Sequence, residues 1–159
     1  VKGNFRALLR LVQRGVPLPL ASVANRRSFI FIENLIDLIE AALVAPAALG
    51  QAFLMRDDRE VGTPDLVRLI AHGLERPARL LPCPPGALRA AARLAGRSED
   101  AERLLGSLAV DDMETRVRLG WRPRIALDAG VAATCRWFRS LEPPQCGPGS
   151  SESMRPSRR

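Results

Sequence analysis

The sequence contains no tyrosine and only one histidine, and these two absences remove whole classes of site. Without tyrosine, no phenol of this chain can act as an acid, a base or a nucleophile. The single histidine, His72, excludes a site built from several imidazoles. We expect it to be a surface residue, because no base, nucleophile or metal partner lies at a usable spacing. The sequence therefore predicts no catalytic residue and no metal site of its own.

Cysteine and long apolar runs are also scarce. Cys83, Cys135 and Cys146 are odd in number and widely spaced, which suits neither a disulfide framework nor a zinc site. They fit a reducing compartment. No window approaches the roughly 18 to 20 apolar residues of a membrane span, and the first residues lack the pattern of a secretory leader. We expect a soluble cytoplasmic protein without a membrane partner.

Positive charge is plentiful but comes almost entirely from arginine. The formal net charge is +7, and Lys2 is the only lysine. The arginines are scattered among Asp and Glu, whereas a nucleic-acid-binding protein usually gathers them on one face beside exposed aromatic residues. We therefore expect no nucleic-acid partner and interpret most arginines as solvated helix residues.

Length, hydrophobic content and periodicity predict one helix-rich α/β domain over residues 1–142, followed by a disordered basic tail over 143–159. Apolar residues at helical spacing follow several residues that can cap a helix, which predicts a series of helices. The last predicted helix carries Val131, Thr134, Cys135 and Phe138 on one face. Short apolar runs predict strands over 29–32, 51–56 and 78–81, with an extended segment over 18–22. The candidate helix caps are Asn4, Asn34, Thr63, Ser98 and Asp111.

A dinucleotide-binding protein needs a glycine-rich turn between a strand and a helix, so that the backbone can approach the pyrophosphate. The sequence contains no GxGxxG or GxxGxxG pattern, and its glycines fall at expected helix ends and turns. We expect no NAD to bind this chain alone.

Several motifs occur in a recognisable order: VKGNF, LPL, RRSFIFIENLID, GQAFLMRDDREVGTPDLVRLIA, LLGSLAVD and LGWRPRIALDAGVAATCRWF. Together they resemble the C-terminal, substrate-binding half of NAD-dependent epimerase/dehydratases. These are extended short-chain dehydrogenase/reductases with a Rossmann fold. The resemblance covers residues 1–139 and points most of all to UDP-glucose and UDP-N-acetylglucosamine 4-epimerases. It implies a helix-rich C-terminal subdomain with short strands, without the nucleotide-binding half.

In that family the N-terminal half carries the NAD site, the catalytic Ser/Thr and a Tyr-x-x-x-Lys pair. Because this chain has no tyrosine, the resemblance implies a fragment, from a truncated reading frame or a split product, that binds a UDP-sugar but is inactive alone. Its implied partners are the UDP-sugar and a separate N-terminal NAD-binding half. The sugar, the choice between epimerase, dehydratase and reductase, and the oligomeric state stay open.

The resemblance also assigns substrate-binding residues. Arg27 takes the place of the family arginine that grips the diphosphate, and Arg103 roughly the place of a second, although Leu104 and Ser107 depart from the family pattern there. A guanidinium suits this task because its fork of N–H groups matches phosphate oxygens.

Asn4 and Phe5 fall where the family meets the nucleotide, and Pro19 and Ala21 fall on the segment beside the uracil. Each assignment has a structural alternative. Asn4 could be only a helix cap, Arg27 could pair with a neighbouring carboxylate, and Arg103 could be a solvated helix residue. The whole chain could instead be a non-catalytic helical interaction protein, or could bind nucleic acid through its arginines and tail.

Overall fold

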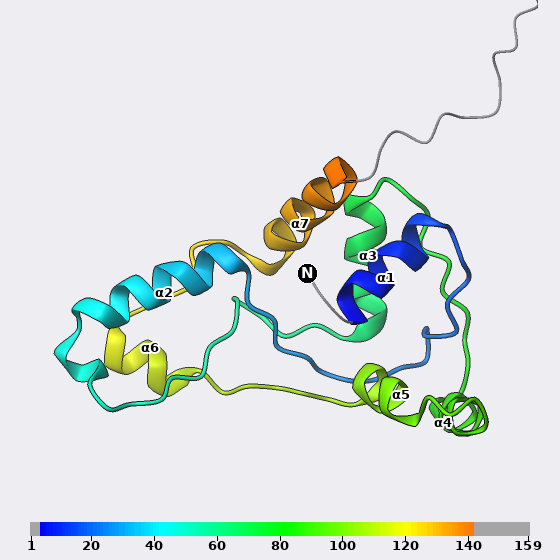
Figure 1. The fold of residues 1–159 in the computed structure, drawn as a ribbon, viewed down its shortest axis with the longest axis horizontal. Coiled ribbons are helices and arrows are strands. Elements are labelled where there is room, and N and C mark those ends of the chain that lie inside the picture. The colour runs from blue at the N-terminus through cyan, green and yellow to red at the C-terminus, as the bar shows by residue number, and fades with distance from the viewer. Residues whose placement is uncertain (1–3, 142–159) are drawn as a thin grey trace, which may run out of the picture.

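The structure is a computed structural model that describes residues 4–141, except for the side chain of Asn4 (Figure 1). Its regular secondary structure is helical, and long segments without regular structure connect the helices. Its helices, in chain order, are α1 (Asn4–Gln13), α2 (Ile32–Val44), the short 3-10 helix η1 (Pro46–Ala48), α3 (Thr63–Gly73), α4 (Pro85–Leu94), α5 (Ser98–Leu105), α6 (Met113–Leu119) and α7 (Leu127–Leu141). None of these helices is long and apolar enough to cross a membrane.

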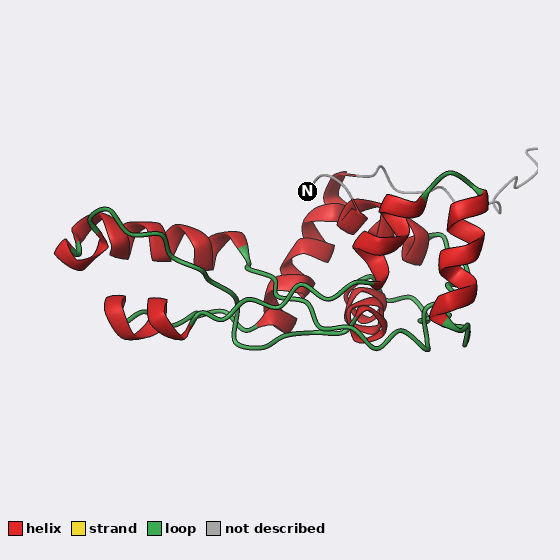
Figure 2. Cartoon of the chain, turned by 90° about the horizontal axis from the view of Figure 1, so that it is seen from below, coloured by secondary structure: helices red, strands yellow, loops and turns green. Residues whose placement is uncertain are grey.

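The helices form a body and an arm (Figures 1 and 2). In the body, α3 packs against α1 and α7, while α5 packs against α1 and α4. In the arm, η1 contacts both α2 and α6. The long connecting segments run between the two parts, and Figure 2 shows the arm projecting away from the body.

The main hydrophobic core lies in the body. Helix α3 contributes an apolar stripe to it, because Leu66, Val67, Ile70 and Ala71 are all buried, as is Leu74 directly after the helix. Helices α1 and α7 pack against this stripe with buried apolar residues of their own. The spacing of these residues is that of a helix with one buried face. Full burial of one such side chain contributes about 1.5 to 3 kcal/mol. The core residues added by α1 and α7 are Leu8, Leu9, Val12, Leu127, Val131, Cys135 and Phe138.

The predicted strands are wrong as extended elements. In the described residues, strand pairing is limited to isolated bridges: Leu18 with Leu80 in parallel, and Arg27 with both Val61 and Leu108. The apolar run over 29–32 instead leads into α2, and the segment 51–56 forms no bridge. A short apolar run does not by itself distinguish a buried strand from the approach to a helix. The fold is therefore helix-rich with almost no strand, and the α/β expectation is only partly met.

Several predicted helix caps are also wrong. Asn34 lies inside α2, whose N-cap is Phe31, and Thr63 is the first residue of α3, whose N-cap is Gly62. Both side chains are buried and bond to distant segments instead of to the start of their own helix. Asn and Thr favour caps, but the same donors and acceptors also suit long-range contacts.

Ser98 and Asp111 also miss the N-cap position by one residue. Ser98 is the first residue of α5, whose N-cap is Arg97. Asp111 precedes Asp112, the N-cap of α6, and accepts a hydrogen bond from the backbone N–H of Met113 at 3.0 Å. Asn4 is the first residue of α1, but its side chain lies outside the described part. The predicted tail 143–159 and the domain boundary at 142 also lie outside the described residues.

Candidate functional site

A small cavity in the body brings together three of the six predicted site residues: Phe5, Arg27 and Arg103. Its volume is about 80 Å³. It lies where α1, the segment around Arg27, the start of α3 and the end of α5 meet. Its other lining residues are Leu8, Phe29, Thr63, Leu66 and Leu104.

The backbone around Arg27 is fixed on two sides. Arg27 and Val61 exchange two backbone hydrogen bonds, each 3.0 Å long. On the other side, the N–H of Ser28 donates to the carbonyl of Leu108 at 2.9 Å, and the N–H of Leu108 donates to the carbonyl of Arg26 at 2.9 Å. The Arg27 side chain therefore leaves a rigid, doubly paired segment and is not on a free loop.

Arg27 is half-buried as a residue, and its guanidinium donates an exposed hydrogen bond to the backbone carbonyl of Arg103, in the last turn of α5. Among residues 4–141 no carboxylate forms an ion pair with Arg27, so the alternative of a neighbouring carboxylate is not met there. Its remaining N–H groups can bond to a ligand.

The two neighbouring arginines behave differently. Arg26 does not line the cavity and pairs with Glu60 at 2.6 Å, while 78% of its side chain is exposed. Arg103 lines the cavity, and its guanidinium pairs with Glu99, one helical turn earlier, at 3.2 Å. Because both partners of this pair are exposed, it contributes little and a ligand anion can displace it.

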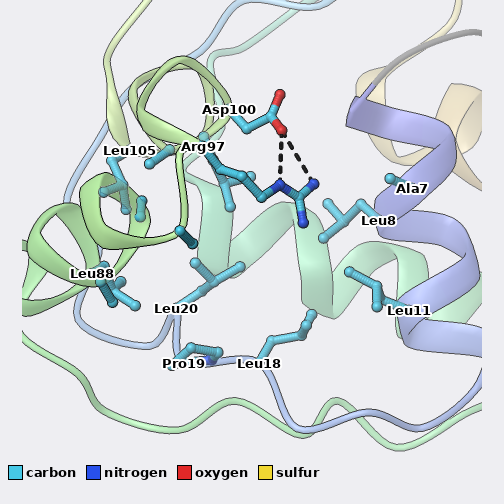
Figure 3. A pocket seen from close by; sticks show the side chains of 15 residues that line it. Ala7, Leu8, Leu11, Leu18, Pro19, Leu20, Leu88, Arg97, Asp100 and Leu105 are labelled. Carbon is cyan, nitrogen blue, oxygen red and sulfur yellow. Dashed lines mark hydrogen bonds and ion pairs between the residues drawn. The ribbon is translucent and has the colours of Figure 1, made fainter.

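Pro19 lies in a second and larger cavity, a groove of about 430 Å³ (Figure 3). Side chains of α1, the segment 18–20, α4 and α5 line it, and almost all of them are apolar. The exceptions are Arg97 and Asp100, which pair with each other at 3.1 Å. Figure 3 shows this pair on one side of the groove and Leu18, Pro19 and Leu20 on the other.

The groove and the small cavity both include Leu8 and Leu104 in their lining, so they adjoin. Ala21 lines neither of them, and its N–H donates to the carbonyl of Leu81 at 3.0 Å. Phe5 packs against Phe29 with ring centroids 6.1 Å apart. His72 is exposed on α3, as predicted.

Sequence reasoning missed Asn25, which is only 5% exposed. Its side-chain amide donates to the Thr63 hydroxyl at 2.9 Å and to the carbonyls of Leu104 and Gly106 at 3.1 Å each. Its side-chain oxygen accepts from the N–H of Thr63 at 2.8 Å. The partners lie 38 to 81 residues away, so no local sequence pattern could have revealed them.

A second missed network, built on Asn34 and Asp57, joins the arm to the body. The Asn34 amide donates to Asp57 and to the carbonyl of Ile125, both at 2.7 Å, and its oxygen accepts from the N–H of Ile125 at 3.0 Å. The Asp57 carboxylate also accepts from the N–H of Phe31 at 3.1 Å. Burial raises the pKa of Asp57, although these two hydrogen bonds oppose the shift.

Among the described residues, no glycine with a left-handed backbone angle lies in a turn that leads from a strand into a helix as a pyrophosphate-binding turn does. The glycines with left-handed backbone angles are Gly15, Gly50, Gly96 and Gly120, and each follows a helix, whereas a pyrophosphate-binding turn precedes one. Within residues 4–141 no group of three His, Cys, Asp or Glu side chains could hold a metal ion.

The chain is similar to curated epimerases. A UDP-glucose 4-epimerase from Vibrio cholerae is 40% identical over 139 residues, which are 87% of this chain and 42% of the relative. A UDP-glucose 4-epimerase from Mycolicibacterium smegmatis is 28% identical over 117 residues, 74% of this chain and 32% of the relative. The chain thus spans less than half the length of these relatives. No family model matches it.

Two solved structures share the fold. An epimerase from Methanothermobacter thermautotrophicus has a TM-score of 0.65 and 19% identity, over 87% of this chain and 38% of the neighbour. A UDP-glucose 4-epimerase from Thermotoga maritima, solved with UDP-glucose, has a TM-score of 0.56 and 16% identity, over 88% of this chain and 40% of the neighbour. The expected resemblance to epimerases is confirmed.

Proposed function

We propose that this chain supplies the UDP-sugar-binding surface of an NAD-dependent sugar-nucleotide 4-epimerase, in which residues outside this sequence carry out hydride transfer. The observation that carries the proposal is the placement of Arg27. This arginine is half-buried, forms no ion pair among the described residues and faces the same cavity as Arg103, which lies 76 residues later. A guanidinium without a carboxylate partner is suited to bind an anion.

The two adjoining cavities suggest how the UDP-sugar would be oriented. The diphosphate would lie against Arg27, where the fork of N–H groups can bond to phosphate oxygens. Arg103 would contribute a second positive charge after it releases Glu99. The uridine would extend past Leu8 and Leu104 into the apolar groove beside Pro19, where a flat base can displace water from apolar side chains.

The NAD-binding partner would dock on the arm. In α2, four large apolar side chains recur at helical spacing and are 48 to 81% exposed: Ile32, Ile36, Ile39 and Leu43. Such a continuous exposed apolar face is typical of an interaction surface. More than half the length of the curated relatives lies outside the part that this chain matches, so the rest of such a polypeptide is the occupant that we propose.

Isothermal titration calorimetry of the purified chain with UDP and with uridine tests the proposal. We expect UDP to bind about tenfold more tightly or better, because only UDP carries the diphosphate. Equal affinities would refute a diphosphate site on this chain. An RNA oligonucleotide that binds more tightly than UDP and displaces it would favour the nucleic-acid alternative instead.

A further inference from the structure

We infer that Asn25 is a positioning residue that holds Arg27 and the end of α5 in the relative placement needed to bind a diphosphate. The inference rests on the proposed function, because it names a residue that determines whether that site forms. Asn25 itself does not line the cavity. It acts through its neighbours.

The first argument is the position of Asn25 in the chain. It precedes Arg27 by two residues, in a segment whose strand pairing is limited to a single bridged residue. A sheet would normally fix the direction of such an arginine through a continuous ladder of backbone hydrogen bonds. Here the isolated bridges hold only the backbone of residues 26–28, and the side chain of Asn25 adds an anchor directly before them.

The second argument is what Asn25 binds. Two of its acceptors are the carbonyls of Leu104 and Gly106, which follow Arg103 by one and three residues. The guanidinium of Arg27 donates to the carbonyl of Arg103 itself. The same short stretch at the end of α5 is therefore held twice, once by Asn25 and once by the arginine that we propose as the diphosphate ligand.

The third argument is that Asn25 also fixes the opposite wall of the cavity. Its side chain bonds to both the N–H and the hydroxyl of Thr63, and that hydroxyl donates to the carbonyl of Leu104 at 3.0 Å. Thr63 and Leu104 both line the cavity. The approach is close, because a Cβ added to Gly62 would lie 3.2 Å from the backbone oxygen of Asn25.

Few other side chains could replace Asn25. The site requires one acceptor and two N–H donors at the end of a short side chain, and asparagine provides this combination. An aspartate would bring negative charge against two carbonyls, and an alanine would leave the buried N–H of Thr63 and both carbonyls without this partner.

The test compares Asn25→Ala with a matched control, Asn34→Ala. Asn34 is an equally buried amide with a similar number of hydrogen bonds, but it belongs to the junction with the arm and lines neither the small cavity nor the groove. Both substitutions should lower the thermal stability of the 159-residue chain. Only Asn25→Ala should affect the Arg27 site.

Two readouts separate positioning from general destabilisation. Without ligand, the nitrogen-edited NMR signals of the Arg27 guanidinium should shift and exchange faster with water in Asn25→Ala but not in Asn34→Ala. With ligand, the ratio of UDP affinity to uridine affinity should fall about tenfold in Asn25→Ala, towards its value in Arg27→Ala. The same ratio should stay within twofold of wild type in Asn34→Ala.

Unchanged Arg27 signals in Asn25→Ala, or equal effects of the two variants, would overturn the inference. If the wild type shows no preference for UDP but Asn25→Ala still shifts the NMR signals of the Arg27 guanidinium, the proposed function fails and the positioning role stands. Should Asn25→Ala not fold, Thr63→Val removes only the hydroxyl that Asn25 and Leu104 share. It should produce the same changes more weakly, and Thr63→Ser should restore wild-type values. Identical behaviour of the Val and Ser variants would contradict the role.

Discussion

Replacement of Arg27 by alanine should weaken the binding of UDP to this chain about tenfold. The substitution removes one guanidinium and leaves the backbone bridges to Val61 and Leu108 in place, because these involve only main-chain atoms. The cavity should therefore keep its shape. Hydrogen bonds to charged groups contribute about 1.5 to 3 kcal/mol. Since Arg27 is only half-buried and the cavity is small, the lower end applies, and 1.4 kcal/mol is about tenfold in affinity.

Two further variants make the result specific. Arg27→Lys keeps the charge but loses the planar fork, so it should recover only part of the affinity. Arg26→Ala removes the same charge from the adjacent residue, whose exposed side chain pairs with Glu60 and does not line the cavity. Its effect on UDP affinity should stay under about threefold, because Arg26 is not among the residues that would contact the ligand.

Isothermal calorimetry with UDP and uridine on the wild type and the three variants provides the measurement. Uridine affinity should be similar in all four proteins, because the base would lie in the groove and away from Arg27. Equal losses of UDP affinity in Arg26→Ala and Arg27→Ala would show that only net charge matters. No loss in Arg27→Ala would show that the diphosphate ligand is wrongly assigned. If the chain alone binds UDP too weakly to measure, the series belongs in a chain joined to a nucleotide-binding half.

Three other predictions concern the rest of the body and its junction with the arm. Burial raises the pKa of Asp57, so protonation of this carboxyl stabilises the folded state. The stabilisation is complete below about pH 3.8 and is lost as the pH rises through the raised pKa. In thermal melts from acid to neutral pH, the wild type should therefore lose stability relative to Asp57→Asn. Burial also raises the pKa of Cys135 to about 11, so alkylation at pH 8 followed by peptide mapping should find Cys83 modified and Cys135 protected until the protein unfolds. Ile70→Ala should lower the free energy of unfolding by about 2 to 5 kcal/mol in urea titrations, whereas Leu94→Ala, at a side chain 91% exposed, should change it by under about 0.5 kcal/mol.

The helices were largely predictable from the sequence because their signals are local. In α3 the apolar residues recur every three or four positions, and this spacing alone identifies the buried face that the structure confirms. Gly15 and Gly96 follow α1 and α4 with left-handed backbone angles, as glycines at helix ends often do. Each of these features depends on residues within one or two helical turns.

The strands and the polar networks were not predictable, because their partners are distant in sequence. A strand exists only when another segment pairs with it, and the segment 51–56 has no such neighbour among the described residues. Asn34 has the sequence context of a helix cap, yet its partners include Ile125, 91 residues later. The position of Arg27 beside Arg103 followed only from the resemblance to epimerases, since periodicity gives no information on contacts 76 residues apart.

The division into body and arm has a consequence for how the protein loses its structure. The main core contains no residue of α2 or α6, and the arm buries only a few side chains of its own, among them Leu38, Thr115 and Trp121. With so little buried apolar area, the arm should open and close many times before the body unfolds once. Amide protons of α2 and α6 should therefore exchange with solvent faster than those of α3 and α7, and a single melting temperature would describe the body alone.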